Sequence, residues 1–166
     1  MLKIIKNLDD IDFRQLMNVY EQTNCQTGRL EYPKLSENLQ IIYAEQDFYA
    51  FLETFFRTQN AMYCVWQVGG IYSSVLRLEP YQDGMLIEAV ETALAERQKG
   101  YAFALLKSVI AYLSMNGKGK LYAHIEKENV ASLRLHQKCG FTIVADDAVY
   151  IDGIHHLDSY TLCLEY

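Results

Sequence analysis

The sequence predicts a mixed α/β fold, and three observations lead to that prediction. Two apolar runs, over 61–68 and 71–79, flank Gly69-Gly70, which is a typical turn between two antiparallel strands. Apolar residues recur with helical spacing over 102–115, as expected for a helix buried along one face. Predicted strands on either side of that helix, over 85–93 and 121–125, imply a parallel pair joined by a right-handed crossover.

The first sixty residues predict one strand and two helices. Residues 2–5 are expected to form a short strand, and Asp9 or Asp10 to cap the helix that follows it. Residues 25–43 are expected to be irregular or only partly helical. A second helix is predicted from a stripe of apolar residues with helical spacing, which we expect to lie in the core. The stripe consists of Phe48, Phe51, Leu52, Phe55 and Phe56.

The remaining elements complete a sheet of about seven strands with about four helices. Asp83-Gly84 precedes the strand over 85–93, and Asn116-Gly117 ends the helix over 102–115. A helix over 130–138 is closed by Cys139-Gly140. Two strands, over 142–150 and 157–165, are joined through Asp152-Gly153. The predicted order is therefore β-α-α-β-β-β-α-β-α-β-β.

Length and composition predict one folded domain over residues 1–166. With 51% apolar and 22% charged residues, the chain can bury a core and is not expected to be disordered. The net charge of −6 argues against a nucleic-acid-binding protein. The charge is unevenly distributed, because residues 97–138 carry eight basic and two acidic side chains, a sum of +6 that leaves −12 elsewhere. This local positive charge suggests a small anionic ligand.

The sequence predicts a cytoplasmic protein that does not cross a membrane. Residues 1–6 contain two lysines and no long apolar stretch, so no signal peptide is expected. The uncharged run over 58–76 contains Gly69-Gly70 and several polar residues, and it fits two strands better than a membrane span. The four cysteines form no CxxC pair and are expected to be reduced thiols.

The segment from Arg97 to Ala102 is the best candidate for a phosphate-binding loop. It lies between a predicted strand and a helix N-terminus, where four amide groups lack helical partners and the helix dipole is positive. Gly100 and Ala102 are small enough to let a phosphate approach the backbone. Arg97 and Lys99 would add countercharge. The alternative is an ordinary loop glycine beside solvated charges.

Two motifs in this region resemble those of the GNAT superfamily of acetyl-coenzyme A-dependent N-acetyltransferases. Arg97-x-x-Gly100-x-Ala102 is similar to the family pattern Arg/Gln-x-x-Gly-x-Gly/Ala. About 30 residues further on, the segment from Asn129 to Phe141 resembles Asn-x-x-Ser/Ala-x-x-Leu-Tyr/His-x-Lys-x-Gly-Phe. The predicted element order also resembles the GNAT fold over almost the whole chain.

The chain departs from the family pattern at four positions. Leu94 stands where many members have proline, and Gln98 where many have glycine. Ala102 replaces the third glycine of the loop. These three changes leave the phosphate loop plausible, because backbone amides would bind the phosphates. The fourth departure affects the mechanism, because His136 stands where tyrosine is commonest.

The resemblance implies acetyl-CoA as co-substrate and suggests which residues contact it. The strand over 85–93 would separate from its parallel neighbour, so that amides near Val90 and Thr92 pair with the pantetheine arm. The amide of Val90 would polarise the thioester carbonyl. Asn129 would bind the pantetheine, or would only cap the following helix. The other cofactor contacts that the resemblance implies are Arg97, Gln98, Lys99, Gly100, Tyr101, Ala102 and Ser132.

Glu88 is the candidate base that removes a proton from the attacking ammonium. Regular alternation along the strand would place Glu88, Val90 and Thr92 on one face. Alternatively, Glu88 only orients the amine or forms an ion pair. Glu91 is expected to be structural or solvated.

His136 is the candidate acid that gives the leaving thiolate a proton, because the family tyrosine at this position often has that role. The alternative is a histidine that merely packs near the sulfur. His155 and His156 are adjacent in a predicted strand and would point in opposite directions, so no metal site is expected.

The sequence therefore predicts an N-acetyltransferase that acts on a primary amine by direct attack in a ternary complex. The acceptor would be a small amine, a polyamine or a peptide amine, bound beside Tyr32, Tyr43 and Tyr150. A homodimer is common in the family. The alternatives are an acyl-CoA-binding or sensing module without turnover, and a different nucleotide-binding α/β protein.

Overall fold

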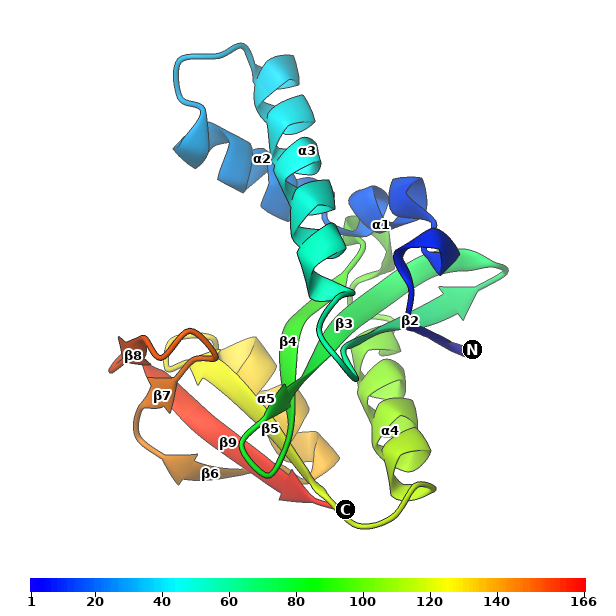
Figure 1. The fold of residues 1–166 in the computed structure, drawn as a ribbon, viewed down its shortest axis with the longest axis vertical. Coiled ribbons are helices and arrows are strands. Elements are labelled where there is room, and N and C mark those ends of the chain that lie inside the picture. Colours follow the sequence, from blue (N-terminus) through cyan, green and yellow to red (C-terminus); the bar gives the residue numbers. More distant parts are fainter.

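A computed structural model describes residues 1–166 and contains a seven-stranded sheet with the order β1-β2-β3-β4-β5-β9-β6 (Figure 1). Only β4 and β5 run parallel, and every other neighbouring pair is antiparallel. The strands are β1 (Leu2–Ile5), β2 (Met62–Val68), β3 (Ile71–Tyr81), β4 (Gly84–Thr92), β5 (Lys120–Glu126), β6 (Thr142–Ala145) and β9 (Ser159–Glu165). The predicted mixed α/β fold with seven strands in the sheet is confirmed.

Five α-helices accompany the sheet, one more than predicted. They are α1 (Phe13–Val19), α2 (Glu21–Glu31), α3 (Glu37–Phe55), α4 (Tyr101–Ser114) and α5 (Val130–Cys139). The additional helix is α2, whose sequence is mostly polar and whose only buried residues are Asn24 and Gly28. Helical periodicity of apolar residues could not predict it, because α2 buries almost no apolar side chains.

Helices α2 and α3 form a hairpin that projects from the rest of the molecule (Figure 1). A Cβ atom on Gly28 would lie 2.6 Å from the carbonyl oxygen of Gln40, so only glycine permits this close approach of the two helices. The hairpin explains why α3 begins at Glu37, eleven residues before the predicted apolar stripe. The first half of α3 packs against α2 instead of the sheet.

The cap of α1 also differs from the prediction. The Asp12 carboxylate accepts a hydrogen bond of 3.0 Å from the Gln15 amide, whereas Asp9 and Asp10 lie in a preceding 3₁₀ turn, Leu8–Asp10. Asp12 occupies the position that lets a side-chain oxygen reach the first helical amides.

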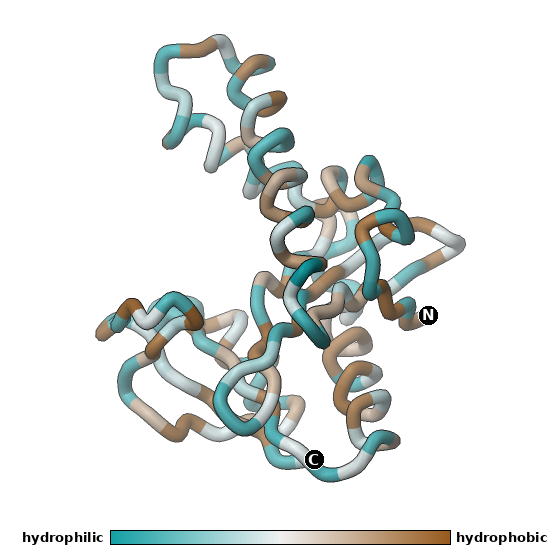
Figure 2. The backbone as a smooth tube through the Cα atoms, in the orientation of Figure 1, coloured by the Kyte–Doolittle hydropathy of each residue, from teal (hydrophilic) through white to brown (hydrophobic).

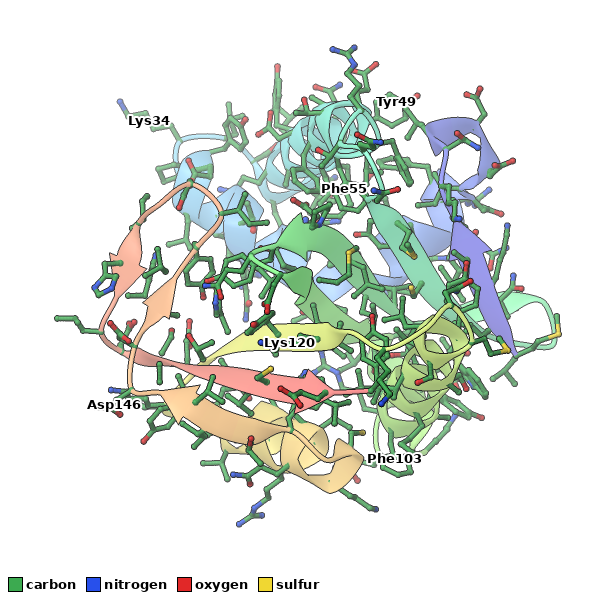
Figure 3. The ribbon with its side chains drawn as sticks, turned by 60° about the horizontal axis from the view of Figure 1, so that its bottom comes forward. Lys34, Tyr49, Phe55, Phe103, Lys120 and Asp146 are labelled. Carbon is green, nitrogen blue, oxygen red and sulfur yellow. The ribbon has the colours of Figure 1, made fainter.

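The core is divided into two apolar clusters, one on each face of the sheet. Helices α4 and α5 cover one face, and α1 and α3 cover the other. Figure 3 shows this division through Phe103 on α4 and Phe55 on α3, which lie on opposite sides of the sheet, and Figure 2 shows α4 as apolar along most of its length. Of the predicted aromatic stripe, Leu52 and Phe55 are buried, whereas Phe51 is 36% exposed.

The predicted crossover is present as β4–α4–β5, but β4 and β5 pair over only three residues. Their register begins at Met85 with Leu121 and ends at Ile87 with Ala123. Beyond that point β4 remains paired with β3, and β5 with β9. The two parallel strands therefore separate in the middle of the sheet.

The last predicted strand pair is rearranged. The expected strand over 142–150 is divided into β6 and the short β7 (Ala148–Val149), and β7 pairs with β8 (His155–His156) in a separate two-stranded sheet around Asp152-Gly153. Strand β9 lies between β5 and β6. None of the helices combines the length and the apolar character needed to cross a membrane.

Candidate active site

A cavity of about 740 Å³ lies where β4 and β5 separate. Strands β3, β4 and β5 and helices α4 and α5 contribute its walls, together with Tyr150. Because the strands no longer pair here, their backbone groups border the cavity. Of the predicted site residues, Glu88, Val90, Thr92, Arg97, Ala102, Asn129, Ser132, His136 and Tyr150 line it.

A β-bulge in β4 changes which side chains share a face. The register of β3 and β4 shifts between Val75, which pairs with Glu91, and Arg77, which pairs with Glu88. Ala89 within the bulge has a φ of 49°, a left-handed conformation that is unusual for a residue other than glycine.

The bulge shows that the predicted alternation along this strand is wrong. Val90 packs on the cluster beside α4, whereas Ala89 packs on the cluster beside α1 and α3. Glu88 points to the same face as Ala89, beside α1 and α3, and forms an ion pair there with Arg77. Glu88 and Val90 therefore approach the cavity from opposite faces of the sheet, because the extra residue interrupts the two-residue period.

The N-terminus of α4 has the features of an anion-binding site. The first helical hydrogen bond, from Ala104 to Gly100, leaves the amides over 100–103 without helical partners. Gly100 has a φ of 81°, and apart from the adjacent residues of the chain no atom lies within 4 Å of the position that a Cβ would occupy there. This loop can therefore present backbone donors and positive potential to a phosphate without steric obstruction.

The two basic side chains of the loop are engaged with neighbouring protein groups. Arg97 Nε donates a hydrogen bond of 3.2 Å to the Thr92 carbonyl oxygen, and its Nη2 lies 3.9 Å from Glu91. Lys99 forms an ion pair of 3.0 Å with Glu96. Gln98, Lys99, Gly100 and Tyr101 lie outside the cavity lining. Charge at the loop is thus partly neutralised, which leaves the backbone amides as its free donors.

Asn129 caps α5, as one of its two predicted roles requires. Its side-chain oxygen accepts a hydrogen bond of 3.1 Å from the Ser132 amide. The side-chain NH₂ group of Asn129 donates no hydrogen bond within the protein and remains available to a ligand. The capping role and a ligand-binding role are therefore compatible.

His136 is buried at the cavity wall with one nitrogen bonded and one free. Its Nδ1 lies 2.9 Å from the Ser132 carbonyl oxygen, and its buried Nε2 has no partner. Burial lowers the pKa of His136, and the hydrogen bond to Ser132 opposes that shift. A carbonyl can only accept, so Nδ1 carries the proton and Nε2 of the neutral ring is an acceptor.

On the other face of the sheet, Glu88 forms an ion pair with Arg77. The Arg77 Nη2 atom lies 3.4 Å from Glu88 Oε2, and both side chains are largely buried. The Arg77 guanidinium carbon also lies 4.5 Å from the centre of the Phe51 ring. These contacts position the Glu88 carboxylate while its second oxygen remains unengaged.

A group of aromatic rings in edge-to-face and tilted contact continues this side of the cavity. His124 lies between Tyr81 and Tyr150, with ring-centre distances of 5.1 Å and 4.8 Å. Both ring nitrogens of His124 are buried without partners. Burial is the main cause that lowers the pKa of His124, and the nearby His156 lowers it further.

Two of the three predicted acceptor residues lie elsewhere. Tyr32 and Tyr43 stack on each other at 5.3 Å in the α2–α3 hairpin, and Tyr32 donates a hydrogen bond to Asp47. Neither lines the cavity, because the hairpin turns that segment outwards. Tyr150 does line it.

Sequence reasoning missed Arg77 and His124 as cavity residues. Arg77 could not be found, because its pairing with Glu88 depends on the strand register. A signal for His124 was available: Leu121, Ala123 and Ile125 alternate with it and form the apolar face of the strand. No three His, Cys, Asp or Glu side chains lie close enough together to bind a metal ion.

Comparison with known proteins identifies a family for most of the chain. The model of the "Acetyltransferase (GNAT) family" matches residues 26–141. No curated protein sequence gives a significant match.

Several solved structures have the same fold. The PaiA N-acetyltransferase from Thermoplasma acidophilum, in complex with coenzyme A, has a TM-score of 0.66 and 13% identity, covering 100% of this chain and 99% of that one. A ribosomal-protein-alanine N-acetyltransferase from Escherichia coli has a TM-score of 0.63 and 16% identity, covering 99% and 94%. A spermidine N-acetyltransferase chimera from Vibrio cholerae has a TM-score of 0.65 and 17% identity, covering 98% and 95%.

Proposed function

Because the chain belongs to the acetyltransferase (GNAT) family, we propose that it transfers an acetyl group from acetyl-CoA to a primary amine within a ternary complex. The observation that carries this proposal is the cavity between β4 and β5, which connects the α4 N-terminus with the Glu88 side of the sheet. One end offers donors to phosphates, and the other offers a carboxylate to an ammonium group.

The residues present fit coenzyme A. The open space over Gly100 leaves room for a phosphate beside the free amides of α4. The Asn129 amide group and the Val90 amide, which has no partner residue in either strand ladder, supply donors along the cavity. We assign cofactor contacts to Val90, Thr92, Asn129, Ser132 and the loop over 97–102.

Acetyl transfer forms a bond between the amine nitrogen and the thioester carbonyl carbon and breaks the carbon–sulfur bond. The electron pair of that bond stays on sulfur, and an ammonium acceptor loses two protons in all. One proton reaches solvent and the other converts the thiolate into the thiol. The protein therefore needs two proton acceptors and one donor to the carbonyl oxygen.

In this proposal Glu88 removes the first proton, directly or through water, because its carboxylate faces the cavity and has one free oxygen. The Val90 amide, which lies at the β4 bulge, donates to the carbonyl oxygen, on which negative charge develops. Nε2 of neutral His136 accepts the second proton from nitrogen and returns it to sulfur. His136 thus becomes the predicted acid only after it has acted as a base.

The acceptor is a cationic primary amine. The cavity lining has net negative charge, because Arg77 and Arg97 pair with Glu88 and Glu91 and Glu126 is left without a basic partner. Tyr150 and His124 contribute ring surfaces. The names of two structural neighbours, which act on spermidine and on a ribosomal protein, agree with this substrate class. We also propose a cytoplasmic location and a homodimer, which cell fractionation and light scattering would test.

The test is to incubate purified protein with acetyl-CoA and a panel of small amines, polyamines and peptides. Release of coenzyme A thiol and an acetylated product in the mass spectrum are expected for at least one amine. Binding of acetyl-CoA without release across the panel would instead support the acyl-CoA-binding module. Protection from heat unfolding by ATP but not by coenzyme A would point to a different nucleotide-binding protein.

A further inference from the structure

Two buried tyrosines lie directly behind the bulge in β4. The Tyr20 hydroxyl oxygen lies 3.0 Å from that of Tyr63 and 3.3 Å from the carbonyl oxygen of Ala89. Tyr20 and Tyr63 are 2% and 0% exposed, so no water competes for these hydroxyl groups. Tyr20 is the residue between α1 and α2, and Tyr63 lies in β2.

The direction of these hydrogen bonds follows from the available protons. The Ala89 carbonyl can only accept, so the single hydroxyl proton of Tyr20 is donated to it. Tyr63 must then donate its own proton to the Tyr20 oxygen. Burial raises the pKa of Tyr20 to about 12 and raises that of Tyr63, so both hydroxyls keep their protons at neutral pH. The result is a hydroxyl chain that runs from Tyr63 through Tyr20 to Ala89.

The accepting carbonyl belongs to the peptide group that carries the Val90 amide. In a planar trans peptide the C=O and N–H bonds point in opposite directions. A hydrogen bond that draws the Ala89 carbonyl towards Tyr20 therefore directs the Val90 N–H away from Tyr20. Val90 and Ala89 both line the cavity, and their side chains pack on opposite faces of the sheet, so this peptide group borders the cavity.

The conformation of Ala89 also needs external support. A φ of 49° is unfavourable for alanine, and such residues persist where surrounding contacts maintain them. The bulge has lost part of its pairing with β3 and lies beyond the last pair with β5. The hydroxyl chain supplies a contact from outside both strand ladders.

We propose that Tyr20, supported by Tyr63, is a positioning residue that holds the Ala89–Val90 peptide so that the Val90 amide points at the reacting carbonyl. This inference rests on the proposed function, in which that amide stabilises the oxyanion. Tyr20 itself touches neither the cavity nor a substrate, so its effect passes through the peptide group.

The test uses acetyl-CoA labelled with ¹³C at the thioester carbonyl, and it needs no acceptor. Isotope-edited infrared spectra of the bound molecule report the polarisation of this carbonyl, because a hydrogen bond to oxygen lowers its stretching frequency. We expect a lower frequency on the wild-type protein than in water. Tyr20→Phe should move it back towards the value in water, and Tyr63→Phe should move it part of the way, while both still bind acetyl-CoA with wild-type affinity.

Tyr72→Phe is the matched control. Tyr72 is a buried tyrosine of the same apolar cluster, and its hydroxyl accepts a 3.1 Å hydrogen bond from the Asp12 amide, away from the bulge. We expect Tyr72→Phe to lose stability like Tyr20→Phe but to keep the wild-type carbonyl frequency. Once an acceptor is known, Tyr20→Phe should lower kcat by about tenfold with an unchanged KM for acetyl-CoA, less than the complete loss of an oxyanion donor.

Equal carbonyl frequencies in wild type and Tyr20→Phe would overturn the proposal. A frequency shift in Tyr72→Phe as large as that in Tyr20→Phe would also overturn it. A wild-type protein that fails to bind acetyl-CoA would instead contradict the proposed function. The two failures are distinguishable because binding is measured before the spectra are compared.

Discussion

Nδ1 of His136 lies 2.9 Å from the carbonyl oxygen of Ser132, one helical turn earlier in α5. This contact orients the imidazole and places its proton on Nδ1, which leaves the buried Nε2 as an acceptor without a partner in a residue of the cavity wall. The family resemblance suggested a proton donor at this position. In the proposed mechanism His136 is instead a proton shuttle, which accepts a proton before it donates one.

Replacing His136 with phenylalanine should remove this shuttle and keep the ring contact with Phe141. We expect kcat to fall by about 10²-fold, a typical contribution of general acid–base catalysis. Burial lowers the pKa of His136, so in the wild type the rate should decline only as pH falls below the ordinary histidine range near about 6.5. The pH dependence of kcat, measured for both proteins, should show this decline only in the wild type. His155→Phe, on exposed β8, is the control and should behave as wild type.

Glu88→Gln should lower kcat/KM for the amine by about 10²-fold or more, because a neutral amide neither attracts an ammonium group nor takes its proton. The change also leaves Arg77 without its carboxylate partner. Glu79→Gln is the matched control, since Glu79 lies on the adjacent strand and does not line the cavity. Equal activities of the two variants in steady-state assays would contradict the proposed base.

His124→Phe should make the protein more resistant to acid. The pKa of His124 is lowered in the folded state, so unfolding binds a proton as pH falls. The wild-type protein should therefore lose stability as pH decreases through about 6.5 towards the lowered pKa, and His124→Phe should lose less.

At pH 7 we expect His124→Phe to be at least as stable as wild type, because it removes two buried nitrogens without partners and keeps the ring contacts with Tyr81 and Tyr150. Thermal unfolding at pH 7 and pH 5.5 provides the measurement. A steeper loss of Tm with falling pH in the variant than in the wild type would contradict the predicted gain in acid resistance.

Gly100→Ala should weaken coenzyme A binding. A φ of 81° costs alanine about 1–2 kcal/mol, and relaxation of this strain would disturb the amides at the start of α4. Gly117→Ala is closely matched, because Gly117 lies just beyond the other end of α4 with a φ of 121° and equally open space. Both variants should lose stability in denaturant titrations, Gly117→Ala at least as much as Gly100→Ala because a φ of 121° lies further from the left-handed region. Only Gly100→Ala should raise the Kd for coenzyme A in calorimetry.

Much of the fold could be predicted because local patterns determine it. In the helix over 102–115 and its flanking strands, the spacing of apolar residues is compatible only with a strand–helix–strand unit. Gly100 marks the loop before the helix. Helix α2 could not be predicted, because it forms by packing its buried Gly28 against α3 instead of burying an apolar stripe. Strand β6 ends early because Ala148 and Val149 pair with His156 and His155. The sequence alone does not reveal that these residues pair with β8.

The candidate site likewise contains residues whose position local sequence could predict and residues whose position depends on tertiary contacts. Of the two motifs, Arg97, Ala102, Asn129 and Ser132 line the cavity close to a helix N-terminus, where local sequence sets the direction of backbone and side chain, and His136 lines it from the last turn of α5. Tyr32 and Tyr43 were misplaced because their position depends on the direction of a whole hairpin. Arg77 and His124 were missed because they meet Glu88 and Tyr150 only through strand register and folding of the β7–β8 segment.

By itself, the sequence determined the α/β class, the phosphate-loop candidate and the residues at both motifs, since these depend on interactions between residues close in the chain. Only the tertiary structure decided on which face of the sheet Glu88 and Val90 lie. A single extra residue in β4 reverses the side-chain alternation after Glu88, and that bulge exists because strands distant in sequence pair and separate around it. The spatial relation between the proposed base and the proposed oxyanion donor is therefore a property of the assembled sheet.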